Sequence, residues 1–320
     1  MAQQGNHARG DATFGGELFE LSDATYALLR DLIVQRTGVW FDPPKRRLLA
    51  DKLSDLVAAN GLTSFLDYYY LLRYDEENAP ATWAALLNRL AVPETFFWRQ
   101  SEQLEVAAST IVPALLARPA RTGGRVRIWS AACCSGEEPV SIAIALAEQG
   151  LLDPRRIEIV ASDASPALIA RARRASYGER SFRQLPVGLR AKYFESDGPD
   201  TWRPIERIRE AITLCVANLV ERDEVAPLAA SDVIFCRNVF IYFSDDAIRR
   251  TARTFVEGMP DDGYVFLGAS ESLTRLGVEL DLVEVAGAFA YIKHPHRMAL
   301  ERERSQHREN RAPELRRVAP

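Results

Sequence analysis

Two neighbouring carboxylates stand at the entrance of a predicted helix, directly after a strand that ends in small residues. The stretch SAACCSGEEP covers residues 130–139 and contains Glu137, Glu138 and a single glycine, Gly136. Strand–turn–helix elbows often bind nucleotides, but a pyrophosphate needs several glycines and an approach free of negative charge. Neither GxGxxG nor GxxxxGK[ST] is present, and two acids would repel phosphate in a partly dry site. They indicate a cationic ligand, although acids in a first helical turn also simply complement the helix dipole.

A third carboxylate, Asp163, closes the next predicted strand, about 25 residues past the turn. A carboxylate at that place can accept both hydroxyls of a ribose. A ligand with a ribose, a base and a cationic group but no phosphate is S-adenosylmethionine, whose ammonium and sulfonium groups suit acids near the loop. The alternative is that Asp163 caps the helix that begins near Ser165.

Histidine is absent from residues 8–293 and occurs only at positions 7, 294, 296 and 307. A Ser-His-Asp or Cys-His mechanism, or a His-based metal site, would have to recruit a terminal histidine, whereas such sites are built on rigid elements. The four cysteines have no metal-ligand spacing. We therefore predict no metal site, and we interpret Cys133 and Cys134 as small apolar fillers.

The elements that must position these side chains form an α/β pattern within residues 122–294. Strands are predicted in RVRIWSAA, IEIVASD and SDVIFCRNVFIYF, and helices follow the first two. This alternation predicts a doubly wound, mostly parallel sheet that binds ligands at the carboxyl ends of its strands. Residues 131–138, 162–163 and 236–238 would meet there. Two late strands, in GYVFLGASES and GAFAYIKH, would form a hairpin, and residues 180–217 form a small inserted antiparallel β-subdomain.

The sequence of the N-terminal part predicts helices. Residues 20–90 are predicted to form an all-α domain, and residues 91–121 a linker helix, from apolar periodicity and from caps such as Ser22 and Gly61. The polar segment 1–19 and the Arg/Glu/His-rich tail 295–320 are predicted to be flexible.

The composition is that of an ordinary soluble globular protein, with 47% hydrophobic and 26% charged residues. A net charge of −4 argues against a general nucleic-acid binder. No apolar run reaches the roughly 18 residues that span a bilayer, and the N-terminus lacks a signal-peptide core. We therefore predict a cytoplasmic protein that does not insert into membranes.

Six motifs resemble the CheR-type chemotaxis receptor methyltransferases in order and spacing along residues 20–293. They are VPETFFWRQ (92–100), WSAACCSGEEPVSIA (129–143), ASDASPALIARARRASY (161–177), ANLV (217–220), SDVIFCRNVFIYF (231–243) and GASES (268–272). The occurrence of both SGEEP and FCRNVFIYF in one chain is a specific sign of this family, whereas neither motif alone would be. The resemblance implies a class I, Rossmann-like enzyme that moves the methyl group of S-adenosylmethionine onto glutamate side chains of a chemoreceptor's cytoplasmic helical coiled coil, leaving S-adenosylhomocysteine.

The resemblance also implies the site residues. The acceptor carboxylate is ionised near pH 7 and needs no general base, and its chemistry suggests that Arg99 orients it and that Tyr242 donates a hydroxyl to it or lines the path of the methyl group. The alternatives are that Arg99 pairs with an acid at the domain interface and that Tyr242 is an aromatic wall residue. Pro93 stands where the family typically has asparagine, so one side-chain contact is lost. The cofactor contacts would be Thr95, Arg99, Ala132, Glu138, Asp163, Asn218, Leu219, Arg237 and Asn238.

A predicted basic helix completes the interpretation. It carries Lys45, Arg46, Arg47 and Lys52, which would bind acidic receptor helices or form an ordinary solvated face. The turn after Phe194 is shorter than in family members that bind a receptor's C-terminal peptide. We therefore predict recognition without such a tether, by a monomer.

Two other functions stay open at this point. One is a non-catalytic S-adenosylmethionine-binding sensor or scaffold. The other is a methyltransferase for a different substrate, although the N/D-P-P-Y/F turn of base-methylating enzymes is replaced by RNVFIYF.

Overall fold

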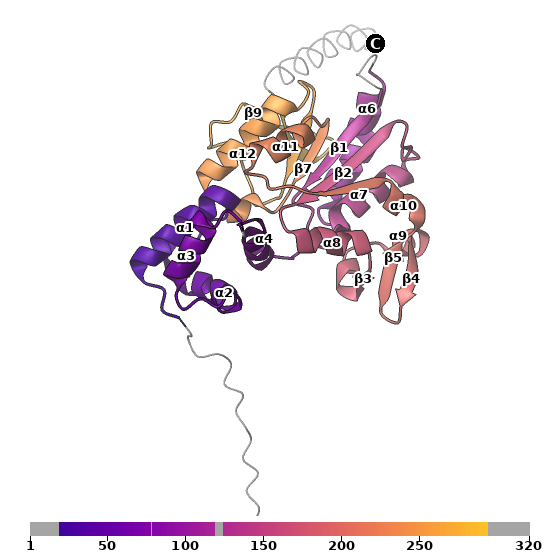
Figure 1. The fold of residues 1–320 in the computed structure, drawn as a ribbon. Coiled ribbons are helices and arrows are strands. Elements are labelled where there is room, and N and C mark those ends of the chain that lie inside the picture. The colour runs from indigo at the N-terminus through magenta and orange to yellow at the C-terminus, as the bar shows by residue number, and fades with distance from the viewer. Residues whose placement is uncertain (1–18, 78, 119–123, 294–320) are drawn as a thin grey trace, which may run out of the picture. The chain divides into compact units, whose positions relative to one another are not determined.

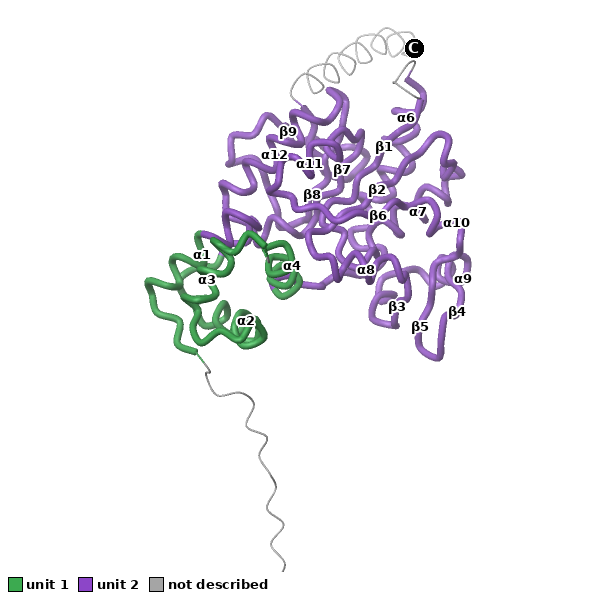
Figure 2. The backbone as a smooth tube through the Cα atoms, in the orientation of Figure 1, with its two compact units in different colours: residues 1–31, 41–89 green, residues 32–40, 90–320 purple. Residues whose placement is uncertain are grey.

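The computed structural model describes residues 19–77, 79–118 and 124–293 (Figure 1). The chain divides into two compact units, residues 1–31 with 41–89 and residues 32–40 with 90–320 (Figure 2). The segments predicted to be flexible, 1–19 and 295–320, lie outside the described residues except for Phe19. Within the described ranges, no helix combines the length and the apolar character that crossing a membrane requires.

The first unit is helical, as predicted. It contains most of α1 (Asp23–Thr37), the 3-10 turn η1 (Pro43–Lys45), α2 (Arg46–Ala59), α3 (Phe65–Tyr74) and α4 (Ala79–Leu90). Helix α2 buries Leu49, Leu53 and Val57, whose four-residue spacing places one apolar stripe against the core. Ser64 caps α3, because its hydroxyl accepts the backbone N–H of Asp67 at 3.1 Å.

A seven-stranded sheet forms the centre of the second unit, in the order β6-β2-β1-β7-β8-β10-β9. Neighbours from β6 to β8 run parallel, while β10 is antiparallel to both β8 and β9. The predicted doubly wound, mostly parallel sheet is therefore confirmed. The strands are β1 (Val126–Ala131), β2 (Ile157–Asp163), β6 (Ile212–Val216), β7 (Val233–Cys236), β8 (Tyr264–Leu267), β9 (Leu280–Val285) and β10 (Ala288–Lys293).

Alternate residues of β1 face two different helix layers, as the two-residue period of a strand requires. Val126 and Ile128 pack with α7 (Glu137–Glu148) and with the helical run 101–116. Trp129 and Ala131 pack on the other side, with helices α11 and α12. The remaining bounds are α5 (Ser101–Val106), the π-helical turn η2 (Ala107–Ile111), α6 (Val112–Leu116), α11 (Arg222–Ala229) and α12 (Asp245–Gly258). The predicted linker helix over residues 91–121 is wrong for residues 91–100, which are not helical, because Trp98 and Gln100 have φ angles of 66° and 53°.

The strand order reverses beside β1. The chain runs from β1 to β2 and β6 on one side and then crosses to β7 on the other. Ala131, the last residue of β1, pairs with Ser162 of β2 and with Cys236 of β7. The loops that follow these parallel strands therefore leave the sheet at one edge, where ligands bind in doubly wound folds.

The inserted sheet is antiparallel, as predicted, and has the order β3-β5-β4. One prediction needs correction, because residues 212–216 were placed in the insertion but form β6 of the main sheet. The segment ITLCV is half-exposed at the edge of the sheet, so it lacks the fully apolar pattern of a central strand. The elements of this region are α8 (Pro166–Arg174), β3 (Tyr177–Gly178), η3 (Glu179–Phe182), α9 (Val187–Tyr193), β4 (Phe194–Gly198), β5 (Thr201–Pro204) and α10 (Glu206–Glu210).

The late hairpin also differs from the prediction. β8 and β10 do pair antiparallel, but the hairpin partner of β10 is β9, which the sequence analysis missed. Ala286 and Gly287 connect β9 to β10 with φ angles of 48° and 91°, as expected for a two-residue turn. β9 is an edge strand with a solvent-exposed Leu282, which explains its weak apolar signal.

Candidate functional site

The turn after β1 has a backbone conformation that few residues adopt. Ala132, Cys134 and Gly136 have φ angles of 59°, 54° and 96°, in the left-handed region. The Tyr177 hydroxyl donates to the carbonyl oxygen of Ser135 at 3.0 Å, and a Cβ atom on Gly136 would lie 2.9 Å from that hydroxyl. The single glycine is therefore required by its φ angle and by the close approach of Tyr177.

Asp163, at the end of β2, ties this turn to the start of α8. Its Oδ2 accepts the backbone N–H of Cys134 at 2.9 Å, and its Oδ1 accepts that of Ser165 at 2.9 Å. The helix cap is a different side chain, because the Ser165 hydroxyl accepts the N–H of Leu168. Burial raises the pKa of Asp163, and the two backbone hydrogen bonds partly oppose that rise.

Glu138 forms a buried ion pair across the point where the strand order reverses. Its Oε2 accepts Nε of Arg237, in the loop after β7, at 2.7 Å. The two side chains are 13% and 2% exposed, so water screens their charges little. The other carboxylate oxygen, Oε1, accepts the hydroxyl of Ser130 at 2.6 Å. The structure therefore brings together the predicted site residues Glu138 and Arg237.

Arg237 also holds the segment that precedes α5. Its Nη1 donates to the carbonyl oxygen of Arg99 at 2.9 Å and to Oε1 of Gln103 at 3.1 Å. The amide nitrogen of Gln103 donates to the carbonyl oxygen of Leu267, at the end of β8. One guanidinium thus joins α7, the loop after β7 and the 99–103 segment, and Gln103 was not identified from the sequence.

The predicted residues Thr95 and Arg99 lie in the non-helical stretch that precedes α5. Thr95 is half-buried. The Arg99 side chain donates Nη1 to the carbonyl oxygen of Glu94 at 2.9 Å, and its guanidinium carbon lies 5.4 Å from the centroid of the Phe96 ring. The guanidinium is therefore folded back on its own segment, within the range of a cation–π contact with Phe96.

Glu94 joins the segment to the region around η3. One carboxylate oxygen accepts Nη2 of Arg180 at 2.8 Å, and the other accepts Nη2 of Arg183 at 2.6 Å. The Arg183 guanidinium also lies 3.7 Å from the centroid of the Phe96 ring. We call Glu94, Arg180 and Arg183 the Glu94 clamp; the sequence analysis did not identify it.

Glu137 has a different environment from its neighbour Glu138. It is buried, and its two oxygens accept the hydroxyls of Ser135 at 2.7 Å and Ser181 at 2.9 Å. A carboxylate at the N-terminus of α7 also complements the helix dipole. Glu137 therefore has a structural role at the start of the helix, which is the alternative to ligand binding that we gave for acids in a first helical turn.

The loop after β7 depends on Glu271, to which the sequence analysis gave no role. Its carboxylate accepts three backbone N–H groups, from Asn238 at 2.7 Å, Gly268 at 2.6 Å and Ile241 at 3.2 Å. Asn238 has a φ angle of 61°, a conformation that asparagine tolerates better than most residues. An acid shortly after β8, within the GASES motif, is the signal that could have identified this residue.

Tyr242 lies four residues after Asn238 and is half-buried. Its carbonyl oxygen accepts the backbone N–H of Trp40 at 2.8 Å, and Phe243 forms an isolated bridge with Val39. Residues 32–40, which belong to the second unit, therefore support this loop.

Asn218 and Leu219 follow β6 and are both buried. The Asn218 side chain donates to the carbonyl oxygen of Arg36 at 2.7 Å, and its backbone N–H donates to Glu224. Leu219 packs in the core beside α11 and α12. The side-chain amide of Asn218 is thus already used within the protein.

The four basic residues predicted to bind substrate lie in the first unit and are not equivalent. Lys45 pairs with Asp42 at 3.0 Å and Arg46 pairs with Asp23, while Arg47 is exposed. Lys52 donates to the carbonyl oxygen of Arg89, in the last turn of α4, at 3.2 Å. Burial lowers the pKa of Lys52. Lys52 therefore has a structural contact, whereas the other three are surface residues.

All four cysteines are free thiols. Burial is the main cause that raises the pKa of Cys134 to about 12 and that of Cys133 well above its ordinary value. Both therefore stay protonated at neutral pH, which favours the interpretation as small fillers over reactive groups.

Comparison with known proteins agrees with this architecture. The model of the CheR methyltransferase SAM binding domain matches residues 93–287, and that of the CheR methyltransferase all-alpha domain matches residues 24–91. Chemotaxis protein methyltransferase 2 of Vibrio cholerae is 34% identical over 278 residues, which cover 87% of this chain and 95% of the relative. The chemotaxis protein methyltransferases of Escherichia coli and Salmonella typhimurium are 32% and 33% identical, over 81% and 82% of this chain and 88% of each relative.

The matched domain model names S-adenosylmethionine as the ligand of the second unit's fold. The sheet order and the carboxylates at its ligand-binding edge are compatible with that cofactor. With a domain match over more than half of its length, and with relatives above 30% identity, this chain belongs to the CheR family of S-adenosylmethionine-dependent methyltransferases.

Proposed function

We propose that this chain transfers methyl groups from S-adenosylmethionine to glutamate side chains in the helical coiled coil of chemoreceptors, giving glutamate methyl esters for sensory adaptation. The names of the relatives support chemoreceptors as the substrate class. The structural observation that carries the proposal is the convergence of three loops beside β1. There Asp163 binds the turn after β1 and Glu138 pairs with Arg237.

The Asp163 carboxylate suits a ribose. An ionised carboxylate has about four acceptor positions, and the backbone N–H groups of Cys134 and Ser165 use two of them. The remaining two can accept the adjacent hydroxyls of a ribose. The turn that Asp163 organises would then lie against the cofactor, which gives Asp163 a binding and a positioning role.

Glu138 is our candidate for binding the cationic methionine end of the cofactor. Its oxygens each keep an acceptor position beside Ser130 and Arg237. Arg237 would fix the orientation of Glu138 rather than bind ligand itself. Ala132 and Asn238 would line the same end of the site.

The other cofactor contacts stay proposals on the same basis. We assign Asn218 and Leu219 to the wall beside the adenine, as buried residues after β6. Because the Asn218 amide binds the carbonyl oxygen of Arg36, its contribution would be shape and backbone contact. Thr95 and Arg99 would contact the cofactor from the segment that the Glu94 clamp holds.

Methyl transfer to a carboxylate requires alignment of the reacting atoms and does not require proton transfer. When bound, S-adenosylmethionine supplies a methyl group on a positively charged sulfur. The acceptor glutamate has an ordinary pKa of about 4.3 and is a carboxylate at neutral pH. Holding its oxygen in line with the methyl carbon and the sulfur is the main catalytic contribution, and such positioning can be worth about 7–11 kcal/mol.

Arg99 and Tyr242 are the proposed catalytic residues. Among the described residues, the hydrogen bond of the Arg99 side chain is the one from Nη1 to the Glu94 carbonyl, so other N–H groups remain to orient the acceptor carboxylate. The Tyr242 hydroxyl would donate to the same carboxylate or line the path of the methyl group.

The receptor would be recognised mainly by the basic residues of the first unit. Lys45, Arg46 and Arg47 are exposed and complement acidic receptor helices. We further propose a cytoplasmic monomer that does not use a receptor's C-terminal tether. A hairpin with only two residues between Gly198 of β4 and Thr201 of β5 supports that proposal.

The test is incubation of the full chain with tritium-labelled S-adenosylmethionine and membranes that contain a chemoreceptor. We expect base-labile label on the receptor, because methyl esters hydrolyse in base, and a large loss of label with Arg99→Ala. Cofactor binding without label on any receptor would favour a scaffold. Base-stable label, or label on another molecule, would indicate a different substrate.

A further inference from the structure

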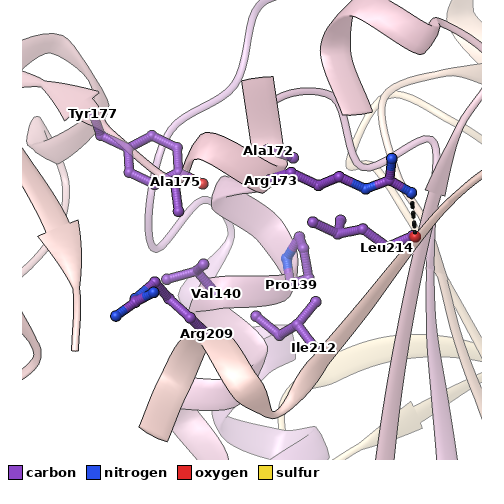
Figure 3. Close-up of a pocket in the computed structure, with 10 residues that line it drawn as sticks. Pro139, Val140, Ala172, Arg173, Ala175, Tyr177, Arg209, Ile212 and Leu214 are labelled. Atoms are coloured by element: carbon purple, nitrogen blue, oxygen red, sulfur yellow. Dashed lines mark hydrogen bonds between the residues drawn. The ribbon is translucent and has the colours of Figure 1, made fainter. Parts of the chain in front are cut away.

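A concave site lies against the turn that follows β1, because Gly136 of that turn lines it. It is an open groove of about 290 Å³ between α7, α8, α10 and β6 (Figure 3). Gly136 and Tyr177 line it, whereas Asp163, Glu138 and Arg237 do not. The groove is therefore distinct from the proposed cofactor site, although both contact the same turn.

The floor of the groove is apolar. Pro139 and Val140 come from α7 and Ile212 and Leu214 from β6, and Figure 3 shows these four side chains close together. No acidic residue lines the groove. A ligand with a hydrophobic body would therefore displace water from this floor without burying a carboxylate.

Two arginines, Arg173 and Arg209, flank this floor (Figure 3). Nη2 of Arg173 donates to the carbonyl oxygen of Leu214 at 3.1 Å, and Nε of Arg209 donates to that of Pro204 at 2.9 Å. These bonds orient the guanidiniums but do not neutralise their charge. Over the described part of the chain, neither arginine has an ion pair.

Other arginines of the same region differ in this respect. Arg180, Arg183 and Arg190 each pair with a glutamate. Each guanidinium at the groove keeps most of its five N–H donors, and guanidinium geometry matches carboxylate and phosphate oxygens. The charge and the donors therefore point to an anionic ligand.

We propose that this groove binds a small organic anion that has an aromatic or aliphatic body and a carboxylate or phosphate group. Figure 3 shows the two guanidiniums at opposite ends of the apolar floor, so the anionic group would lie on one of them and the body on the floor. The volume lies near the lower limit of ligand pockets, which favours a small molecule. The ligand would touch Gly136 and Tyr177, and so the proposed cofactor turn.

The probe for this site is 2-naphthyl phosphate, titrated into the full chain by calorimetry. We expect saturable binding of one molecule per chain, weakened at least roughly tenfold by Arg173→Gln with Arg209→Gln. Two reference compounds separate the two parts of the ligand. Inorganic phosphate lacks the body and 2-naphthol lacks the charge, and both should bind at least roughly tenfold more weakly.

The matched control is Arg171→Gln with Arg207→Gln. These exposed arginines lie on the same helices, α8 and α10, but do not line the groove. The control changes net charge by the same amount and should leave binding unchanged, and thermal unfolding checks that all variants fold. Saturating S-adenosylmethionine should not displace the probe.

Four results would overturn the proposal. The first two are full affinity in the groove variant and equal loss in the control variant. The other two are displacement of the probe by S-adenosylmethionine and lack of saturable binding at millimolar probe.

Discussion

At the scale of single residues, the three carboxylates of the site differ in their surroundings. Glu137 is buried between two serine hydroxyls, Glu138 pairs with Arg237, and Asp163 accepts two backbone N–H groups. Adjacent helical residues point about 100° apart, so Glu137 and Glu138 face different parts of the molecule. Only Glu138 and Asp163 therefore remain candidates for binding a ligand.

Replacement of Gly136 by alanine tests the turn after β1. We expect Gly136→Ala to lower the free energy of unfolding by about 2–4 kcal/mol, since its φ angle is 96° and a Cβ would lie 2.9 Å from the Tyr177 hydroxyl. Affinity for S-adenosylmethionine should fall as well. Denaturant unfolding and calorimetry measure the two effects.

Gly150→Ala is the control for that substitution. Gly150 has a φ angle of 67°, but a Cβ there would meet nothing within 4 Å. It should cost only about 1–2 kcal/mol, the strain of the left-handed backbone alone, and leave cofactor affinity unchanged. Equal effects at both glycines would contradict the role of the Tyr177 contact.

The pH dependence of stability tests the burial of Asp163. Its folded-state pKa is raised above the ordinary 3.8, so ionisation is disfavoured in the folded protein. As pH rises above about 4, the wild type should lose stability relative to Asp163→Asn, until the folded-state pKa is passed. The lost hydrogen bond of the variant is a constant offset and does not change this trend.

Unfolding in denaturant at several values between about pH 4 and pH 8 measures the difference. A stability difference that stays flat over this range would show that the two backbone hydrogen bonds balance desolvation, and one that changes in the opposite direction would show that they outweigh it. Either result would contradict the prediction.

At the scale of elements, side chains that bind backbone groups hold the loops of the site together. Arg237 reaches the carbonyl oxygen of Arg99, and Glu271 accepts three N–H groups from the loops after β7 and β8. These contacts orient loops that contain little regular secondary structure. The loops are therefore preorganised by residues that need not touch a substrate.

The Glu94 clamp gives a prediction at this scale. Glu94→Gln should leave the free energy of unfolding within about 1 kcal/mol of the wild type, because exposed ion pairs contribute little to stability. It should lower kcat/KM for receptor methylation roughly three- to tenfold, because the segment that carries Thr95 and Arg99 loses its anchor.

The matched control is Glu257→Gln, which removes a similar exposed pair with Arg222, between α12 and α11 and away from both the segment and η3. Its activity should equal that of the wild type. Comparable activity losses in both variants would mean that the clamp has no particular role in positioning.

At the scale of the whole molecule, the chain divides its tasks between two units. The second unit contains the sheet and every proposed cofactor contact, while the first contains the exposed basic residues proposed to bind the receptor. If the first unit recognises the receptor, changes to its surface should affect receptor binding without affecting the cofactor.

Reversal of one charge tests this division. Arg47→Glu should raise the KM for the receptor roughly three- to tenfold at low ionic strength, with kcat and S-adenosylmethionine affinity unchanged. The effect should shrink as salt rises, because the Debye length is only about 10 Å at 0.1 M. Arg73→Glu, at an exposed arginine in the last turn of α3, is the control and should have no effect.

Local patterns were enough to identify the class of fold and the cofactor. The elbow at residues 130–139 and Asp163 at a strand end are local signals, because strand alternation, helix caps and small-residue turns depend on neighbours in sequence. They predicted the parallel sheet and the edge where its loops meet.

Tertiary structure decided which side chains are available there. Gln103 binds a carbonyl 164 positions away, and Asn218 binds one 182 positions away. The edge strands β6 and β9 likewise depend on pairing with distant strands. No local pattern encodes such contacts, because they form only when separate segments pack against each other, and they determine which polar groups are already satisfied.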